Sequence, residues 1–307
     1  MHRSRAAALP SVRRARGRYV YGHDGRRYLD CYLNDGRGIL GHRPPRVSTV
    51  VKDVISTGRY AEYPSEFEHR MRKELSRILG RDWSVGLYAG EGDALSVVGA
   101  LTDRSPVRVD PVVAAVRGRR HSDVGKPATP DSEVAVFYWR PYLDHVVDLS
   151  EAEFVLPVVP FPGRWAGQPL CSRKRESLPA AEPLSPVGLS GQVRALQTLH
   201  AVLAELRPRG EAISRSTRPD PGPVLRPTKP PPLSIFRGRG PYLVPICAEE
   251  EYEGVFYTFL RNGIILHPDY WAPSIWSAED ASHDAKKFAE LDAACARELG
   301  LPSAEPT

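Results

Sequence analysis

A glycine-containing turn at residues 90–94 has the composition of a site for an anion. It follows a short apolar segment, residues 85–88, that predicts a strand, and it precedes an apolar segment that predicts a helix. The first N–H groups of a helix have no partner within the helix, and they bind phosphates and carboxylates. The residues therefore predict a strand, glycine-containing loop and helix unit, in which a nearby aspartate would repel a phosphate. The residues of this turn are Gly90, Glu91, Gly92, Asp93 and Ala94.

Two groups of acidic residues and histidines have residue types suited to acid–base chemistry. Asp144, His145 and Asp148 form one group, and His121 with Asp123 forms the other. Adjacent side chains on an extended strand face opposite sides, so neighbouring positions do not by themselves make a proton-sharing pair. We interpret both groups as polar loop residues.

The four cysteines lie far apart in the sequence, and none forms a CxxC pair. This spacing predicts neither a zinc site nor a disulfide framework, and no metal site is expected. No apolar run approaches the roughly 20 residues of a membrane-spanning helix, and the basic residues 1–18 are not followed by an apolar signal region. We therefore expect a cytoplasmic protein without a membrane partner.

The net charge of +5 is mild, and arginine makes up 35 of the 42 basic residues, which are spread along the chain. A nucleic-acid partner is therefore not expected. Residues 3–18 and 117–120 are more strongly basic, and we interpret them as a solvated tail and a charged loop.

Apolar periodicity and glycine positions predict the elements before residue 207. Two short strands, residues 18–21 and 27–33, flank a glycine-rich turn, and a helix over residues 47–55 follows. A second helix should begin with a capping box of Ser65 and Glu68. A longer helix should begin at Pro186. Further strands, nearly continuous in apolar residues, are predicted at residues 107–116, 133–139 and 154–159.

The segment at residues 207–235 contains many prolines and has no sustained periodicity, which predicts an extended or disordered connector. After it, residues 242–247 and 263–267 predict strands around a helix at residues 249–262. A final helix should be capped by Ser277 and Asp280. The predicted parts are an N-terminal arm, hairpin and helix at 1–58, an α/β domain at 59–206, the connector at 207–235, and a small domain at 236–307.

Three segments in this order resemble the class III aminotransferases, pyridoxal phosphate enzymes of fold type I that include glutamate-1-semialdehyde aminomutase. The hairpin at residues 18–30, continued by Gly38-Ile-Leu-Gly-His42, is similar to the family's entry hairpin. Residues 90–94 are similar to its cofactor-phosphate loop, and residues 259–288 to its small domain. The resemblance implies an α/β fold: a reduced three-layer large domain with a small C-terminal α+β domain. It also implies pyridoxal phosphate as cofactor and a homodimer.

The sequence differs from this family at the residues that carry out the family's chemistry. The family needs a lysine for a Schiff base and an aspartate to hold the pyridine nitrogen protonated. The middle of the chain is short, and no lysine stands at the expected position ahead of Ser185. Two other lysines could in principle supply the Schiff-base amine. Lys126, about thirty residues after the turn, is the first, and Lys174, between two arginines, is the second. We interpret both as surface residues.

The preferred hypothesis is a shortened homologue that has lost this lysine, and possibly the cofactor, and acts as a non-catalytic scaffold or binding subunit. The first alternative is an active pyridoxal phosphate-dependent aminotransferase or aminomutase that uses Lys126 and takes a small amino or keto acid as substrate. The second alternative is a binding protein for a small molecule with a phosphate, held at the turn of residues 90–94.

Overall fold

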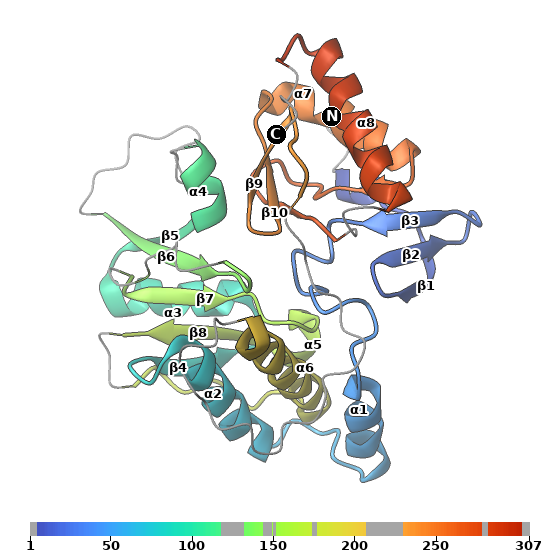
Figure 1. Ribbon diagram of the computed structural model, residues 1–307. Coiled ribbons are helices and arrows are strands. Elements are labelled where there is room, and N and C mark those ends of the chain that lie inside the picture. The colour runs from blue at the N-terminus through green and yellow to red at the C-terminus, as the bar shows by residue number, and fades with distance from the viewer. Residues whose placement is uncertain are drawn as a thin grey trace.

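The computed structural model describes residues 5–117, 132–143, 149, 152–173, 177–206, 230–277 and 282–302. Figure 1 shows an α/β body below and a second region above it, in which both ends of the described chain lie. The α/β body contains a five-stranded sheet, and the second region contains a four-stranded and a three-stranded sheet. This is the mixed α/β architecture that the sequence predicts.

The five-stranded sheet has the order β4-β8-β7-β6-β5. Strand β8 is antiparallel to both neighbours, while β7, β6 and β5 are parallel to one another. The carboxyl ends of β4, β7, β6 and β5 therefore lie at the same edge, together with the start of β8. The strands are β4 (Ser84–Tyr88), β5 (Ser105–Val109), β6 (Glu133–Trp139), β7 (Phe154–Pro157) and β8 (Gln168–Ser172).

Helices cover both faces of this sheet, because its strands are apolar on both sides. The largest buried cluster joins helices α1, α2 and α6 to one side of the body, and a second cluster joins α3 to the opposite face through Val98, Val136 and Leu156. The result is a three-layer body (Figure 1). Its helices are α1 (Val47–Ser56), α2 (Glu66–Leu79), α3 (Glu91–Thr102), α4 (Pro111–Arg117), α5 (Gly163–Ala166) and α6 (Pro186–Leu206).

The N-terminal arm and the C-terminal region fold together. Strand β3 of the hairpin pairs in parallel with β11, so the four-stranded sheet has the order β1-β2-β3-β11. The three-stranded sheet has the order β12-β10-β9. Around these sheets lie the 3₁₀ helix η1 (Arg5–Ala8) and helices α7 (Glu249–Arg261) and α8 (His283–Glu298). The strands are β1 (Val12–Arg16), β2 (Tyr19–Gly22), β3 (Arg27–Asp30), β9 (Phe236–Arg239), β10 (Tyr242–Pro245), β11 (Ile264–Ile265) and β12 (Ser274–Ile275).

The prediction of one strand over residues 107–116 is wrong in its second half. Strand β5 ends at Val109, and helix α4 begins at Pro111. The side chain of Asp110 accepts a hydrogen bond from the N–H of Val112 at 3.0 Å, which stabilises the helix start. Proline at the first helical position has no N–H to satisfy, so the sequence Asp-Pro favours a helix here.

Two predicted helix caps are also wrong. Helix α2 begins after Ser65 as expected, but the Ser65 side chain makes no capping hydrogen bond. Helix α8 is capped by Ser282, whose hydroxyl accepts a hydrogen bond from the N–H of Ala285 at 3.2 Å, and not by Ser277. Asp280 lies outside the described residues.

The end of the proline-rich segment is packed into the C-terminal region. Leu233 and Ile235 are buried, and the N–H groups of Ser234 and Ile235 donate to the carboxylate of Asp292 in α8. Residues 207–229 lie outside the described residues. The four cysteines are free and buried. Among the described helices, none is both long enough and apolar enough to cross a membrane.

Candidate functional site

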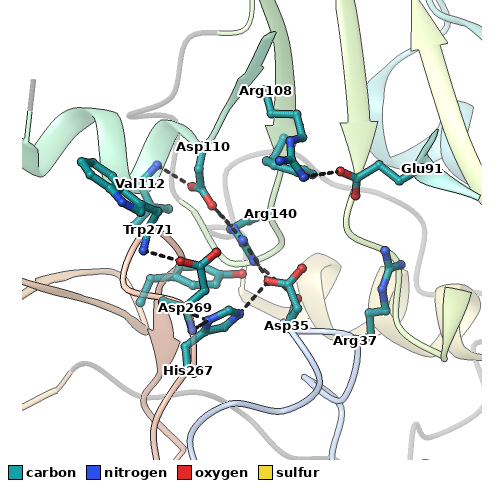
Figure 2. A network of polar contacts seen from close by, with 12 residues as sticks. Asp35, Arg37, Glu91, Arg108, Asp110, Val112, Arg140, His267, Asp269 and Trp271 are labelled. Atoms are coloured by element: carbon teal, nitrogen blue, oxygen red, sulfur yellow. Dashed lines mark hydrogen bonds and ion pairs between the residues drawn. The ribbon is translucent and has the colours of Figure 1, made fainter. Parts of the chain in front are cut away.

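A buried arginine lies at the carboxyl edge of the central sheet. Arg140 directly follows β6, and its side chain is only 2% exposed. Its Nε donates to Oδ2 of Asp110 at 2.8 Å, and its Nη2 lies 2.7 Å from the same oxygen. Asp110 directly follows the neighbouring parallel strand β5, so the sheet itself places the two side chains in contact (Figure 2). This edge, where loops leave parallel strands, is the usual ligand site of open α/β sheets.

Two residues from the second region complete this ion-pair network. Asp35, in the loop after β3, lies 3.2 Å from Nη2 of Arg140 through its Oδ1. Nε2 of His267, which follows β11, lies 3.5 Å from the same Asp35 oxygen. Burial alone would raise the pKa of Asp35, but the charge of Arg140 and the nearby imidazole of His267 lower it well below its usual range. Asp35 is therefore an ionised carboxylate that links the two regions (Figure 2).

The loop that presents Asp35 has a strained backbone. Leu33, Asn34 and Asp35 have φ values of 46°, 50° and 57°, in the left-handed region that side chains other than glycine rarely adopt. Gly36 continues with φ of 83°, and a Cβ at that position would approach the Arg140 guanidinium to 3.4 Å. Such residues cost roughly 1–3 kcal/mol each and concentrate at functional sites. The loop is therefore a second indication of a site at this edge.

The predicted phosphate-binding turn lies at the same edge, and its first helical residue carries a carboxylate that contacts the sheet. Gly90 is the residue before α3, and Glu91 is the first residue of that helix. The Glu91 carboxylate accepts a hydrogen bond from the Tyr138 hydroxyl at 2.6 Å and pairs with Arg108 at 3.2 Å. Gly92 and Asp93 are exposed in the same helical turn, and Ala94 is buried beneath it.

None of the four described lysines lies at this edge. Lys52, Lys73 and Lys286 are exposed on helices α1, α2 and α8, and Lys287 is partly buried in α8. Lys126, the predicted alternative amine, lies outside the described residues, as do Lys174 and Lys229. The acid–base groups at residues 121–123 and 144–148 also lie outside them. Within the described ranges, no group of three or more His, Cys, Asp and Glu side chains could hold a metal ion.

The described residues at this edge do not fit pyridoxal phosphate. A carboxylate that holds a pyridinium nitrogen must be free to accept its proton, whereas Asp110 is bonded to Arg140 and to the N–H of Val112. The helix start that would hold a phosphate dianion has two acidic residues in its first turn, Glu91 and Asp93. The negative charges of Glu91 and Asp93 would repel a phosphate at this helix start.

The network of Asp35, Asp110, Arg140 and His267 is absent from the sequence-based site prediction. These residues come from four separate parts of the chain, and no short motif joins them. One signal was present for Arg140, a charged residue that directly follows the apolar strand predicted at residues 133–139. Asp110 lay inside the strand predicted at residues 107–116, so its position at a strand end was not predicted. Charged residues after parallel strands meet at one edge of the sheet.

No protein-family model matches the chain. An uncharacterized protein of Borreliella burgdorferi is 35% identical over 97 residues, which cover 32% of this chain and 36% of the relative. An uncharacterized protein of Treponema pallidum is 27% identical over 297 residues, or 86% of this chain and 88% of the relative. Glutamate-1-semialdehyde 2,1-aminomutase of Thermus thermophilus is 37% identical over 68 residues, and the match spans only 16% of that enzyme.

Similarity to solved structures extends over nearly the whole chain. An omega-transaminase from Sphaerobacter thermophilus matches 95% of this chain and 91% of its own, with a TM-score of 0.61 and 14% identity. A glutamate-1-semialdehyde aminomutase from Pseudomonas aeruginosa matches 94% of this chain and 87% of its own, with a TM-score of 0.53 and 13% identity. The resemblance and the fold class predicted from the sequence are confirmed. The chain therefore has the fold of the class III aminotransferases, in a shortened form.

Proposed function

We propose that this protein is a non-catalytic relative of the class III aminotransferases that binds a small molecule or a partner through the retained scaffold. One observation supports this most strongly: the buried ion pair between Arg140 and Asp110, at the carboxyl ends of two neighbouring strands. The pair places a fixed positive charge at the sheet edge and occupies the carboxylate that could otherwise serve a cofactor ring.

The electrostatics of Arg140 argue against any role of Asp110 as a free carboxylate. Burial would lower the pKa of Arg140, but the carboxylates of Asp110 and Asp35 raise it above its ordinary value. The guanidinium therefore stays charged and stays bound to both carboxylates. Separating Asp110 from it to bind a ligand would leave a buried charge without its partner, which is strongly unfavourable.

The scaffold is suited to binding because a strained loop and a charged network lie together at the sheet edge, although a catalytic set is not evident among the described residues. The loop at residues 33–36 joins the second region to the sheet edge through Asp35, so a ligand at this edge would contact both regions. The homodimer that the resemblance implies stays a prediction, and sedimentation of the purified chain is the measurement for it.

Absorbance spectroscopy with added pyridoxal phosphate tests the proposal. The wild-type chain should give the spectrum of the free aldehyde, without the visible band of a lysine-bound cofactor. A band in the wild-type chain that disappears in Lys126→Ala, and persists in the exposed control Lys73→Ala, would establish the alternative of an active enzyme with a displaced lysine. The same spectra of Lys174→Ala and Lys229→Ala cover the other two lysines outside the described residues.

A further inference from the structure

The basic residues near the start of the chain form an ordered surface. The interpretation of residues 3–18 as a solvated tail is wrong for residues 12–16, which form the outer strand β1 of the four-stranded sheet (Figure 1). Residues 5–30 hold seven of the 42 basic side chains of the chain and only two of its 37 acidic ones, and the remaining residues carry equal numbers of both. The excess positive charge of the chain is therefore concentrated in its N-terminal arm and hairpin.

Arginines and tyrosines are interleaved on one face of this sheet. The strand pairing places Arg14 opposite Tyr21, and Tyr21 opposite Arg27, in one row across three strands. Arg16 lies opposite Tyr19 in the next row, on the same face, because residues two apart on a strand point in the same direction. The face formed by β1, β2 and β3 therefore carries three arginines and two tyrosines.

The tyrosine rings order the arginine side chains of this face. The guanidinium carbon of Arg14 lies 4.2 Å from the ring centroid of Tyr21, and that of Arg27 lies 4.6 Å from the ring centroid of Tyr19. These are cation–π distances. The arginines are exposed and the tyrosines are partly exposed. The face therefore presents planar cations and aromatic rings to the solvent in fixed positions.

The acidic residues near this face already have partners. Asp24 in the hairpin turn accepts a hydrogen bond from the Tyr28 hydroxyl, and the buried Asp30 pairs with His42 at 2.8 Å. The carboxylate of Asp284 in α8 accepts a hydrogen bond from one tyrosine of the face and lies 4.0 Å from one of its arginines. Because residues 5–30 contain seven arginines, these three carboxylates leave the surface positively charged.

This combination of side chains fits a single-stranded nucleic acid. Backbone phosphates bind arginines, and unstacked bases stack on aromatic rings and on guanidinium planes. An added peptide strand is disfavoured, because a bulge between Val12 and Arg14 interrupts the register of β1. An anionic membrane is disfavoured, because it requires apolar side chains that enter the lipid, and within residues 5–30 Val12 is the only exposed large apolar residue.

We propose that the face of β1, β2 and β3 that carries Arg14, Arg16, Tyr19, Tyr21 and Arg27 binds single-stranded nucleic acid. Arginines supply the contacts to phosphates, and the tyrosines with the arginines stacked on them supply the contacts to bases. None of these residues belongs to the ion-pair network around Arg140, so this surface does not depend on the function proposed above.

Fluorescence anisotropy of a labelled oligothymidylate tests the surface. The wild type should bind it, and the logarithm of the affinity should fall linearly with the logarithm of the salt concentration. The triple variant Arg14→Gln/Arg16→Gln/Arg27→Gln should bind roughly tenfold more weakly or worse, and its salt slope should be smaller by about two. The control triple variant has the same loss of charge at exposed positions of the α/β body and should bind as the wild type does; its changes are Arg59→Gln, Arg70→Gln and Arg81→Gln.

Two single variants separate the contributions of charge and stacking. Tyr21→Leu keeps every arginine, so its salt slope should match that of the wild type while its affinity falls roughly tenfold. Arg16→Glu covers the case in which the triple variant fails to fold, because the exposed Arg16 has no ion pair or hydrogen bond among the described residues. This charge reversal should weaken binding by roughly tenfold.

The proposal would be overturned if the wild type did not bind the oligonucleotide at low salt. Equal losses in the two triple variants would also overturn it, since they would reduce the effect to net charge. Unchanged binding by both Tyr21→Leu and Arg16→Glu would exclude this face. Binding to phosphatidylserine vesicles without binding to the oligonucleotide would identify a membrane surface instead. Each of these results would leave the non-catalytic role intact, whereas a lysine-bound cofactor band would refute that role alone.

Discussion

Oδ2 of Asp110 accepts a hydrogen bond from the Arg140 guanidinium, and Oδ1 of the same carboxylate accepts a hydrogen bond from the N–H of Val112. One side chain therefore neutralises a buried cation at the end of β6 and stabilises the start of α4. This double role makes Asp110 a structural part of the sheet edge. It also explains why the strand expected over residues 107–116 ends at Val109.

Asp110→Asn should destabilise the protein severely. The amide cannot neutralise Arg140, which would stay buried with only the half-exposed Asp35 as a carboxylate partner among the described residues. Breaking a buried ion pair on one side costs about 3–5 kcal/mol. Urea unfolding measures the loss, and the exposed Asp82→Asn is the matched control, with an expected change within about 0.5 kcal/mol. Equal stabilities of the two variants would contradict a buried pair.

The packing of α2 against α6 should depend on pH through Glu74. Burial alone raises the pKa of Glu74, but His200, Arg77 and Gln197 lower it below its ordinary value. A carboxyl with a lowered folded pKa stabilises the protein above the unfolded value of about 4.3, and this contribution is lost as the pH falls below it. The free energy of unfolding of Glu74→Gln should therefore fall less steeply between about pH 5 and pH 3 than that of the wild type.

Urea unfolding at several pH values measures this difference, and the control is Glu66→Gln, which changes an exposed glutamate on the same helix. That control should keep the wild-type pH dependence, since an exposed ion pair contributes little. If Glu74→Gln and the wild type had the same pH dependence, the assigned interaction with His200 would be wrong.

Two glycines within helices should respond to alanine in opposite ways. A Cβ on Gly188 in α6 would lie 1.5 Å from the carbonyl oxygen of Trp165, so α5 and α6 would have to move apart. A Cβ on Gly254 in α7 meets nothing within 4 Å. Gly188→Ala should lose about 1–3 kcal/mol or more, and Gly254→Ala should gain roughly 0.5–1 kcal/mol. Thermal unfolding of both variants measures these changes. If Gly188→Ala were as stable as Gly254→Ala, the close contact between α5 and α6 would be wrong.

Gly92 tests the alternative of a phosphate-binding protein. A Cβ at this position meets nothing within 4 Å, and the residue lies in the first turn of α3, so Gly92→Ala should stabilise the helix by roughly 0.5–1 kcal/mol. Inorganic phosphate should not raise the unfolding temperature of either protein. Stabilisation of the wild type by phosphate, lost in Gly92→Leu, would support the phosphate site.

The sequence predicts the regular elements well where a local signal exists. Apolar periodicity locates α6 and α7, and apolar runs locate β6 and β7. Strand β8 is missed because Gln168-Pro-Leu-Cys-Ser172 contains a proline and no alternation. Its identity as a strand depends on pairing with β4 and β7, which is a tertiary effect.

The charged network could not be predicted in the same way. His267 lies beside Asp35 because β3 pairs with β11, a contact between the two ends of the chain, and Asp35 in turn contacts Arg140. The positive φ of Leu33 also has no sequence signal, whereas Asn34 and Asp35 are residue types that tolerate the left-handed region. The turn at residues 90–94 was located correctly as a helix start, but the bond of Glu91 to Tyr138 requires the folded sheet.

We expect that no lysine of this chain forms a covalent bond with pyridoxal phosphate at the sheet edge. Borohydride reduction of the chain with a slight excess of the cofactor, followed by peptide mass spectrometry, tests it most directly. We predict only trace labelling, distributed over exposed lysines such as Lys52, Lys73 and Lys286. One reduced cofactor per chain on a single lysine, whether Lys126, Lys174 or Lys229, would contradict the claim.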